Sequence, residues 1–129
     1  MSVPYKPANY NTLSPYLVVT GADVTIEFLT QVFGATSLDR FPDENGRVLH
    51  AEVRIDDTVL MLSDEFPPNW PSVGGHVHVY VPDVDATYEK ALKFGATSVQ
   101  VPAKGPDENK RGAVKDSGGT TWWISTKVE

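Results

Sequence analysis

A chain of 129 residues is long enough for one hydrophobic core, and 40% hydrophobic with 22% charged residues is the composition of an ordinary folded domain. The net charge of -6, without a cluster of Lys and Arg, argues against a nucleic-acid partner, because binding to phosphates requires a concentrated basic surface. The absence of cysteine excludes disulfides, iron–sulfur clusters, thiolate zinc sites and a cysteine nucleophile.

The apolar stretches are only a few residues long, far from the roughly 20 that a membrane-spanning helix needs. The first ten residues contain two prolines and no continuous apolar block of the kind found in signal peptides. We therefore expect no membrane partner and a cytoplasmic location.

The first predicted elements are a strand at Leu17–Val19 and a helix that reaches Phe33. The helix is indicated by Ile26, Leu29 and Phe33, whose spacings of three and four place them on one face. An Asp or Thr at its start is expected to cap the first turn, and the glycine after it suits a left-handed stop. Strands at Val48–Ile55 and Thr58–Leu62 follow, joined by a turn at Asp56-Asp57.

The same order of elements returns in the second half, after a proline-rich linker at 65–74. The segment Phe33–Ser37, Phe-Gly-Ala-Thr-Ser, recurs without change as Phe94–Ser98. Further elements are predicted around the second copy: a strand at Val77–Val81, a helix from Val84 to Leu92, and strands at Gly112–Lys115 and Thr120–Thr126. In both halves a Thr/Ser-containing segment with strand propensity also follows the helix, so each half reads βαβββ.

Strand alternation predicts which side chains share a face. In the first half it places Leu49, Ala51, Val53 and Ile55 under the helix, and His50, Glu52 and Arg54 on the opposite face. In the second half it separates Val77, Val79 and Val81 from His76, His78 and Tyr80. The polar, aromatic faces of both halves are either the lining of a shared cavity or a solvated sheet surface. Of Trp122 and Trp123, one is expected under a helix and the other on this face.

Between Leu13 and Val128 the chain resembles the vicinal oxygen chelate superfamily of glyoxalases, bleomycin-resistance proteins and dioxygenases, and within it the PhnB-like, glyoxalase-like branch. The segments that carry the resemblance are Ser14–Val19, Ile26–Phe28, Val32–Ala35, His50–Ile55, Val59–Asp64, His78–Val81, Asp83–Asp85 and Trp122–Thr126. The resemblance implies an α+β fold in which two tandem βαβββ modules, 13–64 and 75–127, form one domain over residues 1–129. Their curved, half-barrel mixed sheet would surround a cleft, and two chains would form a homodimer.

Metal-dependent members of the superfamily hold a divalent ion with His, Gln or Glu at four equivalent places. By strand and by the Gly-His that opens the second half, these places are Ser14, Met61, His76 and Trp123. Only His76 is a competent ligand for a hard or borderline ion. A different set could be assembled from His50, Glu52, His76 and His78, but their mutual reach is not evident from the sequence. We expect no metal and no other cofactor, with a divalent ion at His76 as the less favoured case. The last hairpin, Asp116–Thr120, also departs from the family's usual pattern.

The leading hypothesis is a small-molecule-binding protein that sequesters an aromatic or mixed-polarity ligand. Its predicted binding residues are Tyr16, Arg54, Met61, His76, His78 and Trp123, together with His50 and Glu52. The alternative is a lyase, isomerase or dioxygenase-like enzyme in which His50 transfers a proton and Glu52 orients it. A third possibility is a structural dimer whose sheets serve as an interaction surface. The sequence leaves open the ligand, whether a reaction occurs, and whether the cavity lies within one chain or across two.

Overall fold

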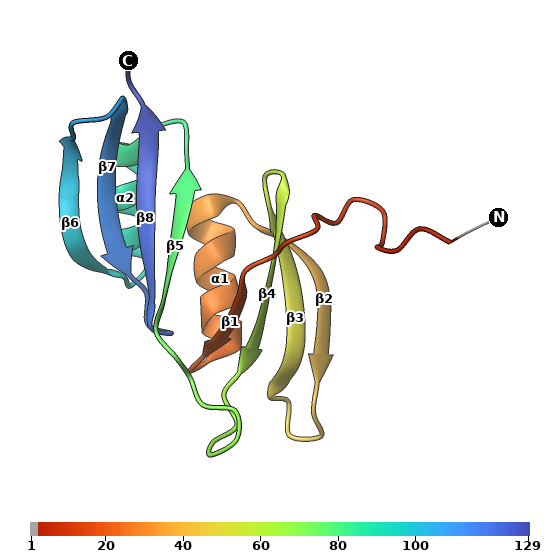
Figure 1. Cartoon of the computed structure of the whole chain (residues 1–129). Helices are drawn as coiled ribbons and strands as arrows, with labels where there is room; N and C mark the ends of the chain where they lie inside the picture. The colour runs from red at the N-terminus through yellow and green to blue at the C-terminus, as the bar shows by residue number, and fades with distance from the viewer. Residues whose placement is uncertain (1–2) are drawn as a thin grey trace.

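The computed structural model describes residues 3–129, in which two helices and eight strands follow one another as two βαβββ units (Figure 1). The first unit comprises β1 (Tyr16–Val19), α1 (Ala22–Phe33), β2 (Thr36–Pro42), β3 (Val48–Ile55) and β4 (Thr58–Asp64). The second comprises β5 (Gly75–Tyr80), α2 (Val84–Lys93), β6 (Thr97–Lys104), β7 (Asn109–Lys115) and β8 (Thr120–Lys127). The predicted modules 13–64 and 75–127 each contain one unit.

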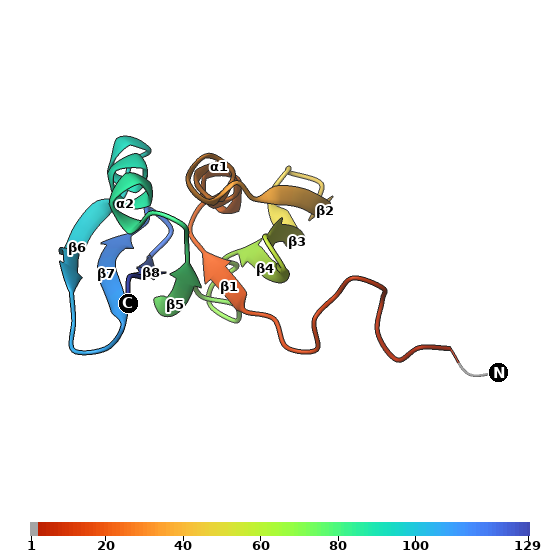
Figure 2. The same ribbon diagram turned by 90° about the horizontal axis from the view of Figure 1, so that it is seen from above.

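Each unit forms its own four-stranded sheet, with strand orders β1-β4-β3-β2 and β5-β8-β7-β6. The first strand of each unit lies parallel to the last, while the other pairs are antiparallel. This confirms the predicted fold of two tandem βαβββ modules, although the two sheets are not closed into a barrel. Both helices lie on the same side of the sheets, which leaves two helix-free faces on the other side (Figure 2).

The repeated pentapeptide occupies equivalent places in the two units. In each copy it ends the helix, and its glycine adopts the left-handed conformation, with φ of 68° at Gly34 and 102° at Gly95. The alanine that follows is buried in both copies, and the threonine after it begins the next strand. The repeat in the sequence is therefore a repeat in the structure.

One hydrophobic core runs through both units on the helix side of the sheets. Trp122 of β8 is its largest fully buried side chain, 1% exposed, and its ring lies 5.1 Å from that of Phe33 at the end of α1. The indole N–H donates to Asp116 Oδ2 at 2.8 Å, so the buried polar group is satisfied. None of the helices in residues 3–129 combines the length and apolar character needed to span a bilayer.

The two helices begin differently, and the prediction of a local side-chain cap for α1 is wrong. At α2, Asp83 accepts from the backbone N–H of Ala86, as expected. At α1 the first residue is preceded by Gly21 without a side-chain cap, and Ala22 N donates instead to Asp64 Oδ1 of β4 at 2.7 Å. Asp23 forms an ion pair with Arg40 of β2. The carboxylate of Asp64, which is distant in the sequence, therefore replaces the local cap of α1.

The predicted placement of Leu49 under the helix is wrong. Leu49 is 51% exposed, while Val48 is fully buried. The strand register explains the difference, because Phe41 and Pro42 of β2 pair with His50 and Val48 of β3, so Leu49 is an extra residue in a β-bulge. Before His50, the bulge shifts by one residue the alternation of side chains between the two faces of β3. After it, Ala51 and Val53 lie on the helix side, as predicted.

Other differences concern strand ends. β7 begins at Asn109, three residues before the prediction, because Asn109, Lys110 and Arg111 pair with the last residues of β8. β4 likewise extends to Asp64 along β1. The linker folds back through a bridge between Phe66 and Trp70.

Candidate functional site

A continuous chain of hydrogen bonds crosses the helix-free face of the first sheet. The Tyr10 hydroxyl donates to Glu52 Oε1, and Glu52 Oε2 lies 2.8 Å from His50 Nε2. The other ring nitrogen, His50 Nδ1, lies 3.1 Å from the Tyr16 hydroxyl. We call these four residues the tyrosine–glutamate–histidine chain. Two predicted catalytic residues and one predicted binding residue thus lie in direct contact.

The strand register places these side chains together. Tyr16 on β1 pairs with Met61 on β4, which in turn pairs with Glu52 on β3, so the three share one row across the sheet. His50 lies two residues before Glu52 on the same face of β3. Arg54, two residues after Glu52, donates to the carbonyl of Asn9 in the segment before β1. The predicted alternation of polar residues along β3 therefore holds.

Glu52 is 9% exposed, and its environment favours the carboxylate. Burial alone would raise the pKa of Glu52, but the hydrogen bonds from Tyr10 and His50, together with the charge of His50, hold this pKa below its usual value. The bond to Glu52 raises the pKa of Tyr10, so the phenol keeps its proton and remains a donor. A carboxylate on Nε2 also fixes the ring orientation of His50, as in acid–base sites.

Aromatic side chains surround this chain. The ring of His50 lies 5.5 Å from that of Tyr16 and stacks on Phe41 of β2 at 6.2 Å. Trp70 of the linker meets Tyr16 edge to face at 6.2 Å, and its indole N–H donates to Ser63 Oγ on β4. The linker therefore contributes one wall of the site, and aromatic rings flank the polar chain at His50 and Tyr16.

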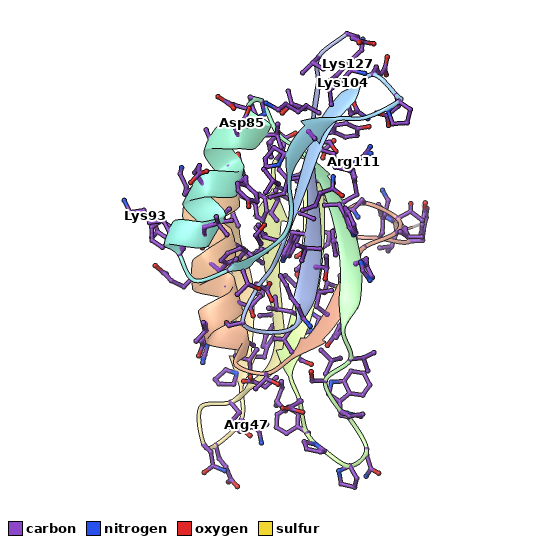
Figure 3. All side chains as sticks on the ribbon, turned by 90° about the vertical axis from the view of Figure 1, so that its left-hand side faces the viewer. Arg47, Asp85, Lys93, Lys104, Arg111 and Lys127 are labelled. Atoms are coloured by element: carbon purple, nitrogen blue, oxygen red, sulfur yellow. The ribbon has the colours of Figure 1, made fainter. Side chains whose placement is uncertain are left out.

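The second sheet carries a separate polar cluster on its helix-free face. Ser125 Oγ of β8 lies 2.9 Å from His78 Nε2, and it also accepts from Arg111 Nε at 2.9 Å. Arg111 is paired with Asp107 at 3.1 Å. Figure 3 shows Arg111 on the helix-free side, opposite to Lys93 of α2. Partial burial, and then the charge of Arg111, lower the pKa of His78, which favours its neutral imidazole.

His76 and Trp123 form a pair next to this cluster. The Trp123 indole N–H donates to His76 Nδ1 at 3.0 Å, and the two rings stack with their centroids 6.1 Å apart. Because Trp122 is buried in the core, Trp123 is the tryptophan of the pair that lies on the helix-free face. The expectation of one indole on each side is confirmed.

The family's four metal positions do not form a ligand set here. Ser14 Oγ accepts from the Asn11 side chain, Met61 offers a thioether, and Trp123 offers no lone pair and donates to His76. In residues 3–129, no group of three or more His, Asp or Glu side chains is arranged to hold an ion. Of these four positions, only His76 therefore offers a competent ligand for a divalent metal.

Two hollows lie near these groups. A cavity of about 330 Å³ lies at the seam between the units, where the hairpin of β3 and β4 approaches β5. Of the predicted site residues, only His78 lines it; its apolar wall is formed by Ile55, Leu60, Val77, Val79 and Trp122. A more open hollow of about 460 Å³ is lined by Asn9, Tyr10, Asn11, Arg54 and Asp57.

The structure therefore divides the predicted residues into two groups, one on each sheet. No hydrogen bond, ion pair or ring contact joins them among residues 3–129. Sequence reasoning missed Tyr10, Phe41, Trp70, Arg111 and Ser125. An isolated tryptophan in a proline-rich linker was a usable signal for Trp70, whereas nothing in the sequence around Tyr10 indicates a contact with Glu52.

Comparison with known proteins supports the same fold. Residues 11–124 match the family described as the Glyoxalase/Bleomycin resistance protein/Dioxygenase superfamily. The uncharacterized protein Mb0911c of Mycobacterium bovis is 34% identical, over 99% of this chain and 88% of its own length. The crystal structure of TioX from Micromonospora sp. ML1 has a TM-score of 0.75 at 25% identity and covers 91% of this chain and 98% of its own. TnmS3, an antibiotic binding protein from Streptomyces sp. CB03234, has a TM-score of 0.71 at 21% identity, with coverage of 95% and 99%.

Proposed function

Because the chain belongs to the glyoxalase/bleomycin resistance protein/dioxygenase superfamily, we propose that it binds and sequesters a small aromatic or mixed-polarity molecule on the helix-free faces of its sheets. The observation that supports this most is the tyrosine–glutamate–histidine chain beside exposed aromatic rings. Aromatic faces supply apolar area, and a few fixed polar groups supply orientation, which is the usual composition of a ligand site. The antibiotic binding of TnmS3 supports small-molecule binding as an analogy on a shared fold.

The proposal assigns the binding residues as predicted. Tyr16, His50, Glu52 and Arg54 would contact the ligand from the first sheet, with Met61 in the same row. His76, His78 and Trp123 would do so from the second sheet. The two groups belong either to one extended site or to sites that a second copy of the chain brings together.

Binding is tested by calorimetric titration with a panel of planar aromatic compounds that includes 2-naphthol. We expect saturable binding that Tyr16→Ala weakens by about two- to tenfold, the worth of one aromatic contact. Tyr5→Ala is the matched control, because Tyr5 is exposed and contacts neither sheet cluster. Absence of binding across the panel would contradict the proposal and favour a structural role.

A second candidate is a lyase, isomerase or dioxygenase-like enzyme. The contact of Glu52 with His50 favours proton transfer, because a carboxylate on one ring nitrogen prepares the other to accept a proton. The test is exchange of a ligand C–H for deuterium in heavy water, followed by NMR. His50→Gln should abolish the exchange while preserving binding; loss of both together would assign His50 to packing.

Homodimer formation, a cytoplasmic location and membership of the PhnB-like branch also stay predictions. Light scattering coupled to size exclusion measures the first directly. A mass of one chain at all concentrations would contradict it and would require the site to lie within a single copy.

A further inference from the structure

The Tyr10 hydroxyl donates to one of the two oxygens of Glu52, a buried carboxylate on the helix-free face of the first sheet. Glu52 is 9% exposed, and its second oxygen is held by His50. A carboxylate can accept more than two hydrogen bonds, but the 9% exposure of Glu52 leaves a third donor little open surface to approach. Displacement of the Tyr10 hydroxyl or of the His50 ring would open that approach. His50 is fixed on both nitrogens, by Glu52 and by Tyr16. Tyr10 is therefore the donor to Glu52 that a ligand can replace.

The backbone around Tyr10 is anchored without its side chain. Asn11 Oδ1 accepts from Val59 N at 2.9 Å, and the carbonyl of Asn9 accepts from Arg54 at 2.7 Å. A change of the Tyr10 rotamer would therefore free Glu52 while the segment stays in place. The open hollow of about 460 Å³ beside Tyr10 and Arg54 provides room for the displaced ring.

The surroundings favour a flat aromatic occupant. Phe41, Tyr16 and Trp70 are 53%, 43% and 45% exposed; the first two rings contact His50, and Trp70 contacts Tyr16. Three exposed large rings in one series of contacts form an apolar patch of the kind that marks a binding surface. A planar ligand would cover this area, as aromatic rings prefer offset or edge contacts with one another.

The charges favour a neutral hydroxyl over other donors or acceptors. A carboxylate or phosphate ligand would be repelled by Glu52 and by the net charge of -6. An ammonium group would place a second positive charge beside Arg54. The carboxylate of Glu52 already has a partner in His50. A phenol reproduces the contact that Tyr10 makes, with the same donor and the same geometry.

We infer that Tyr10 is an internal stand-in for the ligand, and that the site selects aromatic molecules with a free hydroxyl group, which replaces that of Tyr10 on Glu52. This inference rests on the proposed function and adds the class of ligand and the competing side chain. Tyr10 limits affinity, because its bond to Glu52 must break before a ligand hydroxyl binds there.

The experiment compares 2-naphthol with 2-methoxynaphthalene, which has the same ring but no donor, by calorimetry on wild type, Tyr10→Phe and Glu52→Gln. Tyr10→Phe should bind 2-naphthol about fivefold more tightly than wild type, which is about 1 kcal/mol. Its affinity for 2-methoxynaphthalene should not change. Glu52→Gln should remove most of the preference for the hydroxyl. Tyr5→Phe is the control and should match wild type for both compounds.

Unchanged or weaker binding of 2-naphthol to Tyr10→Phe would overturn the inference while leaving the proposed binding function intact. Equal gains for both compounds would also overturn it, because Tyr10 would then act as a steric cover without regard to the hydroxyl. Failure of both compounds to bind any variant would overturn the proposed function and the inference with it.

Discussion

Replacement of Asp116 tests how the last hairpin holds the core. Asp116 is buried in the turn between β7 and β8, where Oδ1 accepts from the backbone of Gly118 and Thr120 and Oδ2 accepts from the Trp122 indole. Asp116→Asn turns an NH₂ group toward either the indole or the backbone donors, so at least one buried N–H loses its acceptor. We expect a loss of about 1.5–3 kcal/mol, and about 3–5 kcal/mol for Asp116→Ala, which removes all three bonds.

Thermal and urea unfolding followed by circular dichroism measures these losses. For a domain of this size the melting temperature should fall by about 4 °C for each kcal/mol. Asp85→Asn is the matched control, since Asp85 forms an exposed ion pair with Lys110, and its effect should stay within about 0.5 kcal/mol.

A double-mutant cycle with Trp122→Phe isolates the indole bond. If the bond stabilises the fold, Asp116→Asn should cost at least about 1 kcal/mol less in the Trp122→Phe background than in wild type. An equal cost in both backgrounds would refute the reasoning, since the indole would then gain nothing from the carboxylate.

Val48→Lys should destabilise the protein by about 3 kcal/mol or more, whereas Leu49→Lys should change stability by less than about 0.5 kcal/mol; the reverse order in urea unfolding would contradict the bulge. Gly118→Ala should lower the melting temperature, because its added Cβ would lie 2.7 Å from Thr25 Oγ1 and 3.1 Å from Val19 Cβ; Gly105→Ala, with 3.7 Å to its nearest atom, is the control and should not. The lowered pKa of Glu52 means that its contribution to stability is present above its unfolded pKa of about 4.3 and is lost as the pH falls through the folded value. The stability advantage of wild type over Glu52→Gln should therefore shrink in acid unfolding, and an advantage independent of pH between 7 and about 3 would show that the carboxylate is not the source.

The fold was accessible from the sequence because local and repeated signals agreed. The identical pentapeptides set the register of the two units, and alternation along β3 and β5 assigned their faces. These patterns arise from the backbone geometry of each element, so they do not depend on distant contacts.

What the sequence could not predict depends on contacts between distant segments. The bulge at Leu49 follows from the pairing of β2 with β3, and the start of α1 is held by Asp64, 42 residues away. Tyr10 reaches Glu52 across the same separation. Side chains that meet through tertiary packing leave no spacing pattern, so His50 and Glu52 were predicted while their partner Tyr10 was not.

The two faces of each sheet are under different constraints in the repeated units. The helix side is constrained by the shared core, in which Leu62 and Ile124 occupy corresponding places in β4 and β8. On the opposite side, Tyr16 and Met61 correspond to His78 and Trp123, and the two halves differ in chemistry at each place. Substitutions there sacrifice little core packing, so the helix-free face of each half can change its chemistry independently of the other without loss of the fold.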